Sequence, residues 1–419
     1  MPKTLYFVDS IYSSVEGNHS LVNLLTTDAS DSEGHVSVTV PRGQLRMNNH
    51  FGTIKEGWYV YYDEGAQIPF SYGNNTAYAR RQFREFKSII EHLAQNNITE
   101  ESGENRSLLE RFSFDLGIDI VSYHVNVGHG NCSLILIRSN VEFQIWMVDC
   151  SLSERRKGNR FAPNLEACFK EIKKRLGKRD EEPLIINRFF LTHPHCDHYG
   201  GVEYLVNQGY INDTTLCYWN IYYHMAGARY IQVLKALQKA NAKFIEPISG
   251  NSTEAIRYLY PECRIFRSRG TVGRYQSKHR IVNRVNNCST VIRFLLGKKK
   301  MVFPGDLELD GFDQMTKRST CSPELFRINY YAISHHGSAN GHPVNPCMSP
   351  AGNHPPTPLY CISYCITKAI LMGRNGAYNG IYDPGVIDYW TKCNNCLVYV
   401  EQAPHYVELE WGSGNLRMA

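Results

Sequence analysis

Three histidines and an aspartate lie within six residues near the middle of the chain, in the run His193-Pro194-His195-Cys196-Asp197-His198. An apolar run ends directly before them, and two glycines follow one residue after them. Neutral imidazole nitrogens and carboxylate oxygens are the usual protein ligands of zinc, and they also suit manganese or iron. Because so many polar groups in one short turn are costly unless they bind something, this spacing predicts a divalent metal site, whereas one histidine alone would predict only a surface residue.

The turn offers two pairs of donors. On an extended segment His193 and His195 lie on one side, and Asp197 and His198 follow after a bend, where they can face a second ion. The glycine pair lets the backbone fold closely over the site. Cys196 lies between the two pairs, and we interpret it as a small spacer and not as a ligand.

Further acids and histidines follow other apolar runs, at Asp149, Asp306 and the pair His335-His336. Each of these alone is more often a cap or a turn residue. Together with the turn at 193–198 they can complete a two-metal site, because one carboxylate such as Asp306 can bridge two cations.

The elements that must position these residues alternate between strands and helices. Apolar and β-branched content predicts strands over 118–127, 133–137, 144–148, 290–296, 300–303 and 329–333. Helical spacing predicts one helix over 165–176, capped by Asn164, and another over 230–237. The order is typical of an α/β protein in which polar site residues gather where strands end.

The first 118 residues differ from the rest in pattern. We expect strands at 36–40 and 58–62, an amphipathic helix over Thr76–Gln95, and a polar linker over 97–107. No catalytic constellation occurs in this stretch. The sequence therefore predicts a smaller N-terminal α+β module over 1–118, of unknown role, and a larger domain over 119–419 that carries the predicted metal site.

Composition narrows the class of protein. The chain has 419 residues, of which 42% are hydrophobic and 20% charged, as in ordinary globular proteins. No apolar run is long enough to span a membrane, and Asp9 interrupts any signal-peptide core, so we expect a cytoplasmic protein with no membrane partner. The 13 cysteines form no dense framework, and the lone Cys393-Asn394-Asn395-Cys396 motif is interpreted as chance spacing.

The net charge of +5 is unevenly distributed. Between Cys263 and Val285 the chain has no acidic residue but seven basic ones, namely Arg264, Arg267, Arg269, Arg274, Lys278, Arg280 and Arg284. Cations beside a metal site favour an anionic substrate such as a phosphodiester. We assign phosphate contacts to Lys278, Arg280 and Arg284.

The motifs and their order resemble the metallo-β-lactamase fold superfamily, whose signature is HxHxDH, and more closely the nuclease-like domain of ComEC-type competence proteins. Five further segments carry the closer resemblance, which covers about 119–412, namely Val127-Gly128-His129-Gly130-Asn131-Cys132, Val148-Asp149-Cys150, Asn286-Asn287-Cys288-Ser289-Thr290-Val291-Ile292, Phe303-Pro304-Gly305-Asp306-Leu307-Glu308 and Ile333-Ser334-His335-His336-Gly337-Ser338. The resemblance implies an αββα sandwich with the metal site at one edge of two facing sheets.

The resemblance also implies six metal ligands, namely His193, His195, Asp197, His198, Asp306 and His336. The first two would bind one ion, the next two a second ion, and Asp306 would bridge. His336 is favoured over His335 because it directly precedes glycine, and His335 would then be an acid or a residue that supports the ligands from behind. Asp149 would hold the histidine loop from behind by hydrogen bonding.

One departure concerns the first ion. Many superfamily members have another histidine in the region that here reads Asn286-Asn287-Cys288-Ser289. The first ion would then be weakly held, held with Asn287 or water, or absent, so one-metal and two-metal chemistry both stay open.

Our first hypothesis is a phosphodiesterase or nuclease that cuts DNA or RNA through a metal-activated hydroxide. It would use one or two divalent ions, zinc or manganese with magnesium as a further option. Asp197 would orient the water and His335 would protonate the leaving oxygen. The alternatives are an ester, lactone or phosphorylcholine-type hydrolase of the same fold, and an effector subunit of a multi-protein complex, with a role in defence as one option, whose N-terminal module binds the partner.

Overall fold

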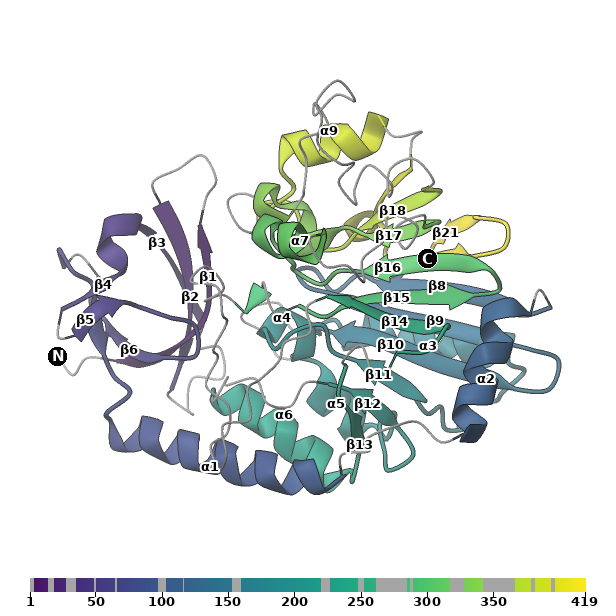
Figure 1. Ribbon diagram of the computed structural model, residues 1–419, viewed down its shortest axis with the longest axis horizontal. Coiled ribbons are helices and arrows are strands. Elements are labelled where there is room, and N and C mark those ends of the chain that lie inside the picture. Colours follow the sequence, from purple (N-terminus) through teal and green to yellow (C-terminus); the bar gives the residue numbers. More distant parts are fainter. Residues whose placement is uncertain are drawn as a thin grey trace.

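The structure is a computed structural model (Figure 1). It describes residues 4–13, 19–27, 35–48, 50–64, 66–96, 103–115, 117–152, 160–219, 227–247, 252–260, 285–286, 289–316, 328–341, 366–377, 381–392 and 396–419. Several residues named above lie outside these ranges, namely Cys263, Lys278, Arg280, Arg284, Asn287, Cys288, Cys393, Asn394 and Asn395. The rest of the basic segment at 264–284 lies outside them as well.

The N-terminal part forms a seven-stranded sheet in the order β3-β2-β1-β6-β7-β4-β5. Its strands are β1 (Leu5–Ser13), β2 (His19–Thr26), β3 (His35–Pro41), β4 (Arg46–Met47), β5 (His50–Thr53), β6 (Tyr59–Tyr62) and β7 (Phe70–Tyr72). Helix α1 (Ala77–Leu93) follows, and the Thr76 hydroxyl caps it by accepting the N–H of Ala79 at 3.1 Å. The predicted helix is thereby confirmed.

A second sheet of eight strands has the order β13-β12-β11-β10-β9-β8-β20-β21. Its strands are β8 (Asp119–Val125), β9 (Cys132–Arg138), β10 (Phe143–Cys150), β11 (Arg188–Phe190), β12 (Leu216–Tyr218), β13 (Lys243–Ile245), β20 (Tyr406–Glu410) and β21 (Leu416–Met418). From β10 to β13 neighbouring strands run parallel. Their carboxyl ends therefore meet at one edge.

A third sheet of six strands has the order β14-β15-β16-β17-β18-β19. Its strands are β14 (Ile256–Tyr260), β15 (Val291–Leu296), β16 (Lys299–Phe303), β17 (Tyr330–Ala332), β18 (Lys368–Leu371) and β19 (Leu397–Tyr399). Strands β15 and β16 form an antiparallel pair, and β16 to β19 run parallel.

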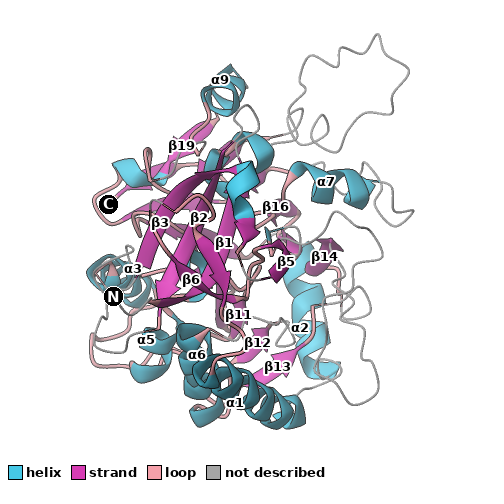
Figure 2. Cartoon of the chain, turned by 90° about the vertical axis from the view of Figure 1, so that its left-hand side faces the viewer, coloured by secondary structure: helices cyan, strands magenta, loops and turns pink. Residues whose placement is uncertain are grey.

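The second and third sheets pack face to face, with helices on both outer faces (Figures 1 and 2). Between the sheets, Trp146 and Phe190 contact Phe294 of the facing sheet. The covering helices are α3 (Ala162–Arg175), α5 (Val202–Asn207) and α6 (Ala228–Lys239) on the second sheet, and α7 (Leu309–Thr316) and α9 (Pro384–Lys392) on the third. The predicted α/β class is confirmed. None of the helices in the described ranges is both long and apolar enough to cross a membrane.

Two local predictions were wrong. The predicted linker at 97–107 overlaps helix α2 (Gly103–Phe114), whose Leu109 and Phe112 are buried beside β15 and join the core between the sheets. Asn164 does not cap α3, because the helix already begins at Ala162. The Asn164 amide instead donates to the carbonyl of Asn126 at 2.7 Å. In both cases contacts with distant parts of the chain, and not the local polar sequence, determine the observed structure.

Candidate metal centre

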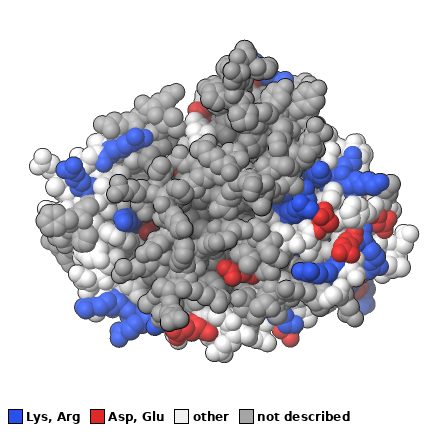
Figure 3. Space-filling model, viewed as in Figure 1, with Lys and Arg blue, Asp and Glu red and all other residues white. Residues whose placement is uncertain are grey.

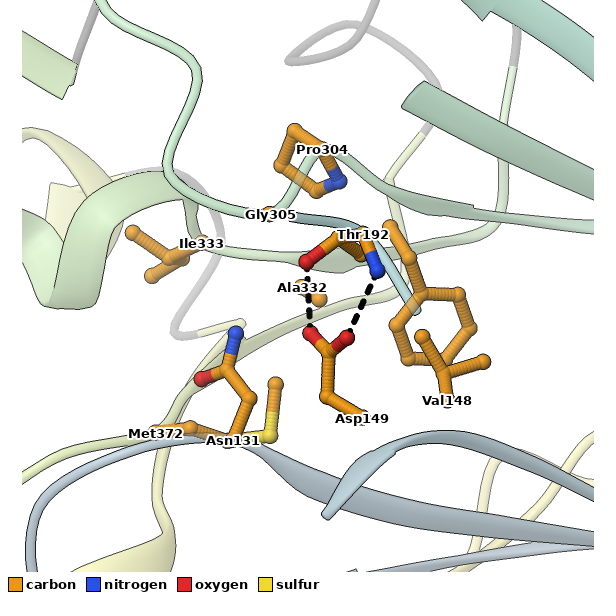
Figure 4. Close-up of a pocket in the computed structure, with 10 residues that line it drawn as sticks. Asn131, Val148, Asp149, Thr192, Pro304, Gly305, Ala332, Ile333 and Met372 are labelled. Carbon is orange, nitrogen blue, oxygen red and sulfur yellow. Dashed lines mark hydrogen bonds between the residues drawn. The ribbon is translucent and has the colours of Figure 1, made fainter. Parts of the chain in front are cut away.

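Five parallel strands end at the same place and carry the site. Asp149 lies at the end of β10, Thr192 follows β11, Asp306 follows β16, and His335 and Met372 follow β17 and β18. Figure 4 shows the pocket at their junction, lined by Asp149, Thr192 and Met372 together with residues of the β8–β9 and β16 ends. The facing sheets thus bring together residues from 149 to 372 in the sequence.

The histidine turn at 193–198 continues from an extended His195 into one helical turn, α4 (Cys196–Tyr199). A Cβ on Gly201 would lie 2.6 Å from both Cys150 Sγ and Leu152 Cγ. The backbone φ of Gly201 is −96°, which any residue adopts. Glycine is therefore required here for the close approach that we expected, and not for an unusual backbone conformation.

One group of four donors gathers around Asp306. The His198 Nε2 atom lies 3.2 Å from Asp306 Oδ1, and His336 Nε2 lies 3.7 Å from Asp306 Oδ2. Asp197 Oδ2 lies 3.4 Å from the same His336 nitrogen. One ligand atom from each of the four residues lies within 4.8 Å of the others, so a single cation can contact all of them.

A second group shares Asp306 and adds the first two histidines of the turn. His193 Nε2 lies 3.8 Å from Asp306 Oδ2 and 3.1 Å from His195 Nδ1. Donor atoms of the three residues also lie within 4.8 Å of one another. The structure therefore brings all six predicted ligands together in two groups, and Asp306 belongs to both.

The donor atoms of these groups fit a divalent cation. Among the described residues, no hydrogen-bond partner exists for six buried atoms of these groups, namely Nε2 of His195, His198 and His336, Oδ2 of Asp197 and both carboxylate oxygens of Asp306. Buried polar atoms are nearly always satisfied in proteins, because leaving them without a partner costs free energy. Here they converge on one another, and nitrogen and carboxylate donors in this number suit zinc or manganese.

The electrostatics of the centre favour added positive charge. Burial acts to raise the pKa of the Asp306 carboxyl, but the charges of His198 and His336 outweigh burial and hold this pKa well below its usual range. Burial acts to lower the pKa values of His198 and His336, but the charge of Asp306 outweighs burial and raises both. Burial lowers the pKa of His195 to about 4, so its nitrogen lone pair stays available. The charge of Asp306 thus favours positive charge beside it, which a bound cation would supply.

Asp149 holds the turn from behind. Its carboxylate accepts the N–H and the hydroxyl of Thr192, each at 2.8 Å, and these are the two dashed bonds in Figure 4. Asp149 Oδ2 also lies 2.7 Å from Nδ1 of His198. A proton on Nδ1 leaves the Nε2 lone pair directed at the centre, which is the usual role of a carboxylate behind a metal-binding histidine.

The adjacent histidines 335 and 336 point in different directions. Both have positive φ, 49° and 50°. His336 is fixed by the carbonyl of Met372, 3.1 Å from its Nδ1, and faces the donor group. His335 lies outside both groups, with Nδ1 3.0 Å from Ser338 Oγ and Nε2 3.3 Å from Asn286 Nδ2. Two consecutive left-handed residues are costly, and such strain is typical of functional sites.

Sequence reasoning missed His129, which lies in the loop between β8 and β9. Its Nε2 is 3.3 Å from Asp197 Oδ2, and its ring centroid is 4.4 Å from that of His336. The loop is held against the turn, because Asn131 N–H donates to the Asp197 carbonyl at 3.0 Å. Gly130, with φ of 119°, has no room for a Cβ, which would lie 2.4 Å from that carbonyl oxygen. A histidine between two glycines at a strand end was the available signal.

The remaining predicted site residues lie outside the described ranges, namely Asn287, Lys278, Arg280 and Arg284. Figure 3 shows the described charges on one face of the molecule. There the described lysines and arginines lie toward the margins, and acidic residues lie among them. On this face the described surface thus offers no purely basic path, and the case for an anionic substrate depends on the 264–284 sequence.

Comparison with solved structures gives weak likenesses, and a long form RNase Z is one of the chains that match. A long form RNase Z from yeast is similar to this chain with a TM-score of 0.28 and 11% sequence identity, over 77% of this chain and 47% of that one. The chain thus spans about half the length of that protein. No protein-family model and no curated protein matches the chain. A TM-score this low supports no statement about function.

Proposed function

We propose that the chain is a metal-dependent hydrolase of the metallo-β-lactamase type, and that it is a phosphodiesterase or nuclease acting on DNA or RNA. The observation that carries the proposal is the pair of donor groups that share Asp306, whose orphaned buried atoms converge at the joined ends of two sheets. The motif order that resembles ComEC-type domains agrees with this proposal. The donors suit one or two divalent ions.

A bound divalent ion would lower the pKa of a coordinated water toward about 7 and polarise a phosphoryl oxygen. Within the chain, His193 and His195 would hold one ion and Asp197, His198 and His336 the other. Asp306 lies between the two groups and would bridge them. Asp197 is the most exposed of the ligands in these groups, at 14%, so its carboxylate can also orient an attacking water.

His335 is our candidate for protonating the leaving oxygen. Its Nε2 faces the amide nitrogen of Asn286, which can only donate, so that ring nitrogen accepts and Nδ1 carries the proton toward Ser338 Oγ. Burial lowers the pKa of His335, which favours this neutral form. To act as the acid, His335 must therefore exchange the contact with Asn286 for a protonated contact with the substrate.

The substrate class rests on the basic segment. The Lys278, Arg280 and Arg284 side chains would contact phosphates, which favours nucleic acid over an uncharged ester or lactone. The N-terminal module would then be a site for a protein partner.

The test is an assay of purified full-length protein on single- and double-stranded DNA and RNA, with zinc, manganese and magnesium in turn. We expect metal-dependent cleavage that Asp197→Ala abolishes and Asp388→Ala retains, because Asp388 is an exposed aspartate on α9 that pairs with Lys392. Full activity of Asp197→Ala would contradict the metal-hydrolase mechanism. Turnover of ester substrates alone would contradict the nuclease assignment.

A second measurement addresses the phosphate contacts. The double variant Arg280→Ala/Arg284→Ala should bind nucleic acid more weakly and reduce the salt dependence, with a slope change of about 0.9 for each phosphate of duplex DNA that is no longer neutralised. Lys170→Ala/Arg179→Ala is the control, because both side chains are exposed on the surface around α3. An unchanged salt slope in the first variant would remove Arg280 and Arg284 from the substrate path.

A further inference from the structure

Strand β1 of the N-terminal module carries a bulge at Asp9. Val8 pairs with Leu24 and Ser10 pairs with Asn23, so Asp9 is the extra residue without a cross-strand partner. Its side chain is only 5% exposed, and its Oδ1 has no hydrogen-bond partner in the part of the chain that the structure describes. Bulges redirect side chains and are frequent beside active sites. A buried acid at such a bulge is therefore a candidate for a functional role.

Asp9 faces the metal-binding turn. The backbone of Cys196 hydrogen-bonds to its carboxylate, and Asp197 and Arg229 interact with it electrostatically. Burial, the charge of Asp197 and that of Glu56 together raise the pKa of Asp9 to about 8. Asp149 holds the same turn from the other direction, through Thr192 and His198. The turn is thus held between one carboxylate of the hydrolase domain and one of the module.

Glu56, which lies just before β6, makes a second contact with the hydrolase domain. It accepts the N–H of Ile11 at 2.9 Å through Oε1 and the N–H of Val285 at 2.6 Å through Oε2. Residue Asn286 follows directly, and its amide contacts His335 Nε2 at 3.3 Å. The module therefore reaches the histidine turn of the second sheet and, through residues 285 and 286, the His335 side of the third.

An apolar contact chain accompanies these polar ones. The Phe7 ring lies 2.8 Å from where a Cβ on Gly227 would be, at the start of α6. On α6, Tyr230 lies 6.3 Å from Phe86 of the module and 5.0 Å from Tyr199 of α4, between ring centroids. The four aromatic side chains belong to one core cluster, and Gly227 contacts it through Phe7. Strand β1 lies on the side of the module that faces α4 (Figure 1). The N-terminal module is therefore packed directly against the rest of the chain.

The geometry points to Asp9 and Glu56 as positioning residues of the metal centre, so that docking of the N-terminal module and metal affinity are linked. Asp9 fixes the backbone of the turn at 193–198, and Glu56 fixes the segment at 285–286 that contacts His335. This inference rests on the proposed metal centre. Linkage requires that metal binding in turn stabilise the β1 bulge against opening.

The test measures metal affinity of the full-length protein by competition with a chelator, for zinc and for manganese. Asp9→Ala should weaken the affinity at least about tenfold, the scale on which residues behind metal ligands act. Glu85→Ala is the matched control, because Glu85 of α1 pairs with Lys235 of α6 at the same interface but away from the turn. Affinity of Asp9→Ala within twofold of the wild type would overturn the inference.

Two further readouts separate positioning from general stability. Asp9→Asn keeps an oxygen that can accept the Cys196 backbone hydrogen bond at the same side-chain size, so it should restore most of the affinity that Asp9→Ala loses; an equal loss in both variants would overturn the inference. In the wild type, metal should slow hydrogen exchange of the β1 amides near Asp9, and unchanged exchange would overturn the inference without any variant. A wild-type protein that binds no metal would overturn the proposed function itself.

Discussion

Two sets of buried polar side chains lie between the same two sheets and differ in how their hydrogen bonds are made. On β8, in what we call the His124 set, His124 has Ser133 Oγ 2.9 Å from Nδ1 and Ser122 Oγ 3.1 Å from Nε2. Trp411 completes this set by donating to Ser122 at 3.0 Å. At the strand ends, by contrast, the Nε2 atoms of His195, His198 and His336 converge with Asp306 and have no hydrogen-bond partner in the described ranges.

The difference shows that burial alone does not make a ligand of a histidine. Burial lowers the pKa of His124 to about 3, and no carboxylate offsets the effect. For His198 burial acts in the same direction, but Asp306 and Asp149 outweigh it and raise the pKa. A core histidine with both nitrogens satisfied is structural, whereas histidines that converge on a shared carboxylate can hold a cation.

The largest expected effect follows from removing the shared carboxylate. Asp306→Ala should lower the hydrolytic rate about a thousandfold, equivalent to about 4 kcal/mol of transition-state stabilisation, because both donor groups lose Asp306 together. Metal content measured by atomic emission should fall in parallel. Retention of two ions per chain would mean that the two groups do not share this ligand.

A smaller effect is expected behind the ligands. Asp149→Asn places an amide opposite His198 Nδ1 and so disfavours the tautomer whose Nε2 lone pair faces the centre. Metal affinity should fall about 10- to 100-fold, as measured by chelator competition. His124→Gln, in the His124 set, should bind metal as tightly as the wild type, and a similar loss in both variants would contradict the difference between the two sets.

Bound metal should stabilise the folded protein only when the donors around Asp306 are intact. At a free concentration 100 times the dissociation constant, a bound ion adds about 2.7 kcal/mol to the free energy of unfolding. Thermal melts with and without chelator should show this gain in the wild type and in His124→Gln, but not in Asp306→Ala. A gain that survives in Asp306→Ala would place the ion elsewhere.

The sequence located the six candidate ligands through the clustered histidine motif, the ends of the apolar strands and the resemblance to ComEC-type domains. The strand ends at Asp149, Asp306 and His335 were predicted from local pattern alone, and the parallel sheets then bring them together. The assignment of these residues to two ions remains a proposal. The division of the chain at 118 and 119 likewise stays a prediction, and Phe7 and Phe86 of the first part share a core with Tyr230.

What the sequence could not give depends on tertiary contacts. His129 reaches Asp197 only because β8, β9 and β10 pair in a register that returns the glycine loop to the turn. Asp9 reaches Cys196 only because a bulge and the docking of the module direct it there. Neither a bulge nor the docking of one domain on another has a short-range sequence signature comparable to a clustered histidine motif.

The smallest expected effect concerns the pH dependence of stability that arises from the His124 set. The pKa of His124 is about 3 in the folded chain, against a value of 6.5 without burial, so the unfolded chain binds a proton that the folded chain rejects. Below about pH 6.5 the folded state should therefore lose stability as the pH falls, with a limiting slope of about 1.4 kcal/mol per pH unit from this one group. His124→Gln keeps a donor and an acceptor but does not titrate, so its loss of stability between pH 6.5 and pH 4.5 should be shallower by up to that slope. Urea unfolding with chelator present measures the difference, and parallel curves for the two proteins would show that His124 does not stay neutral in the folded chain.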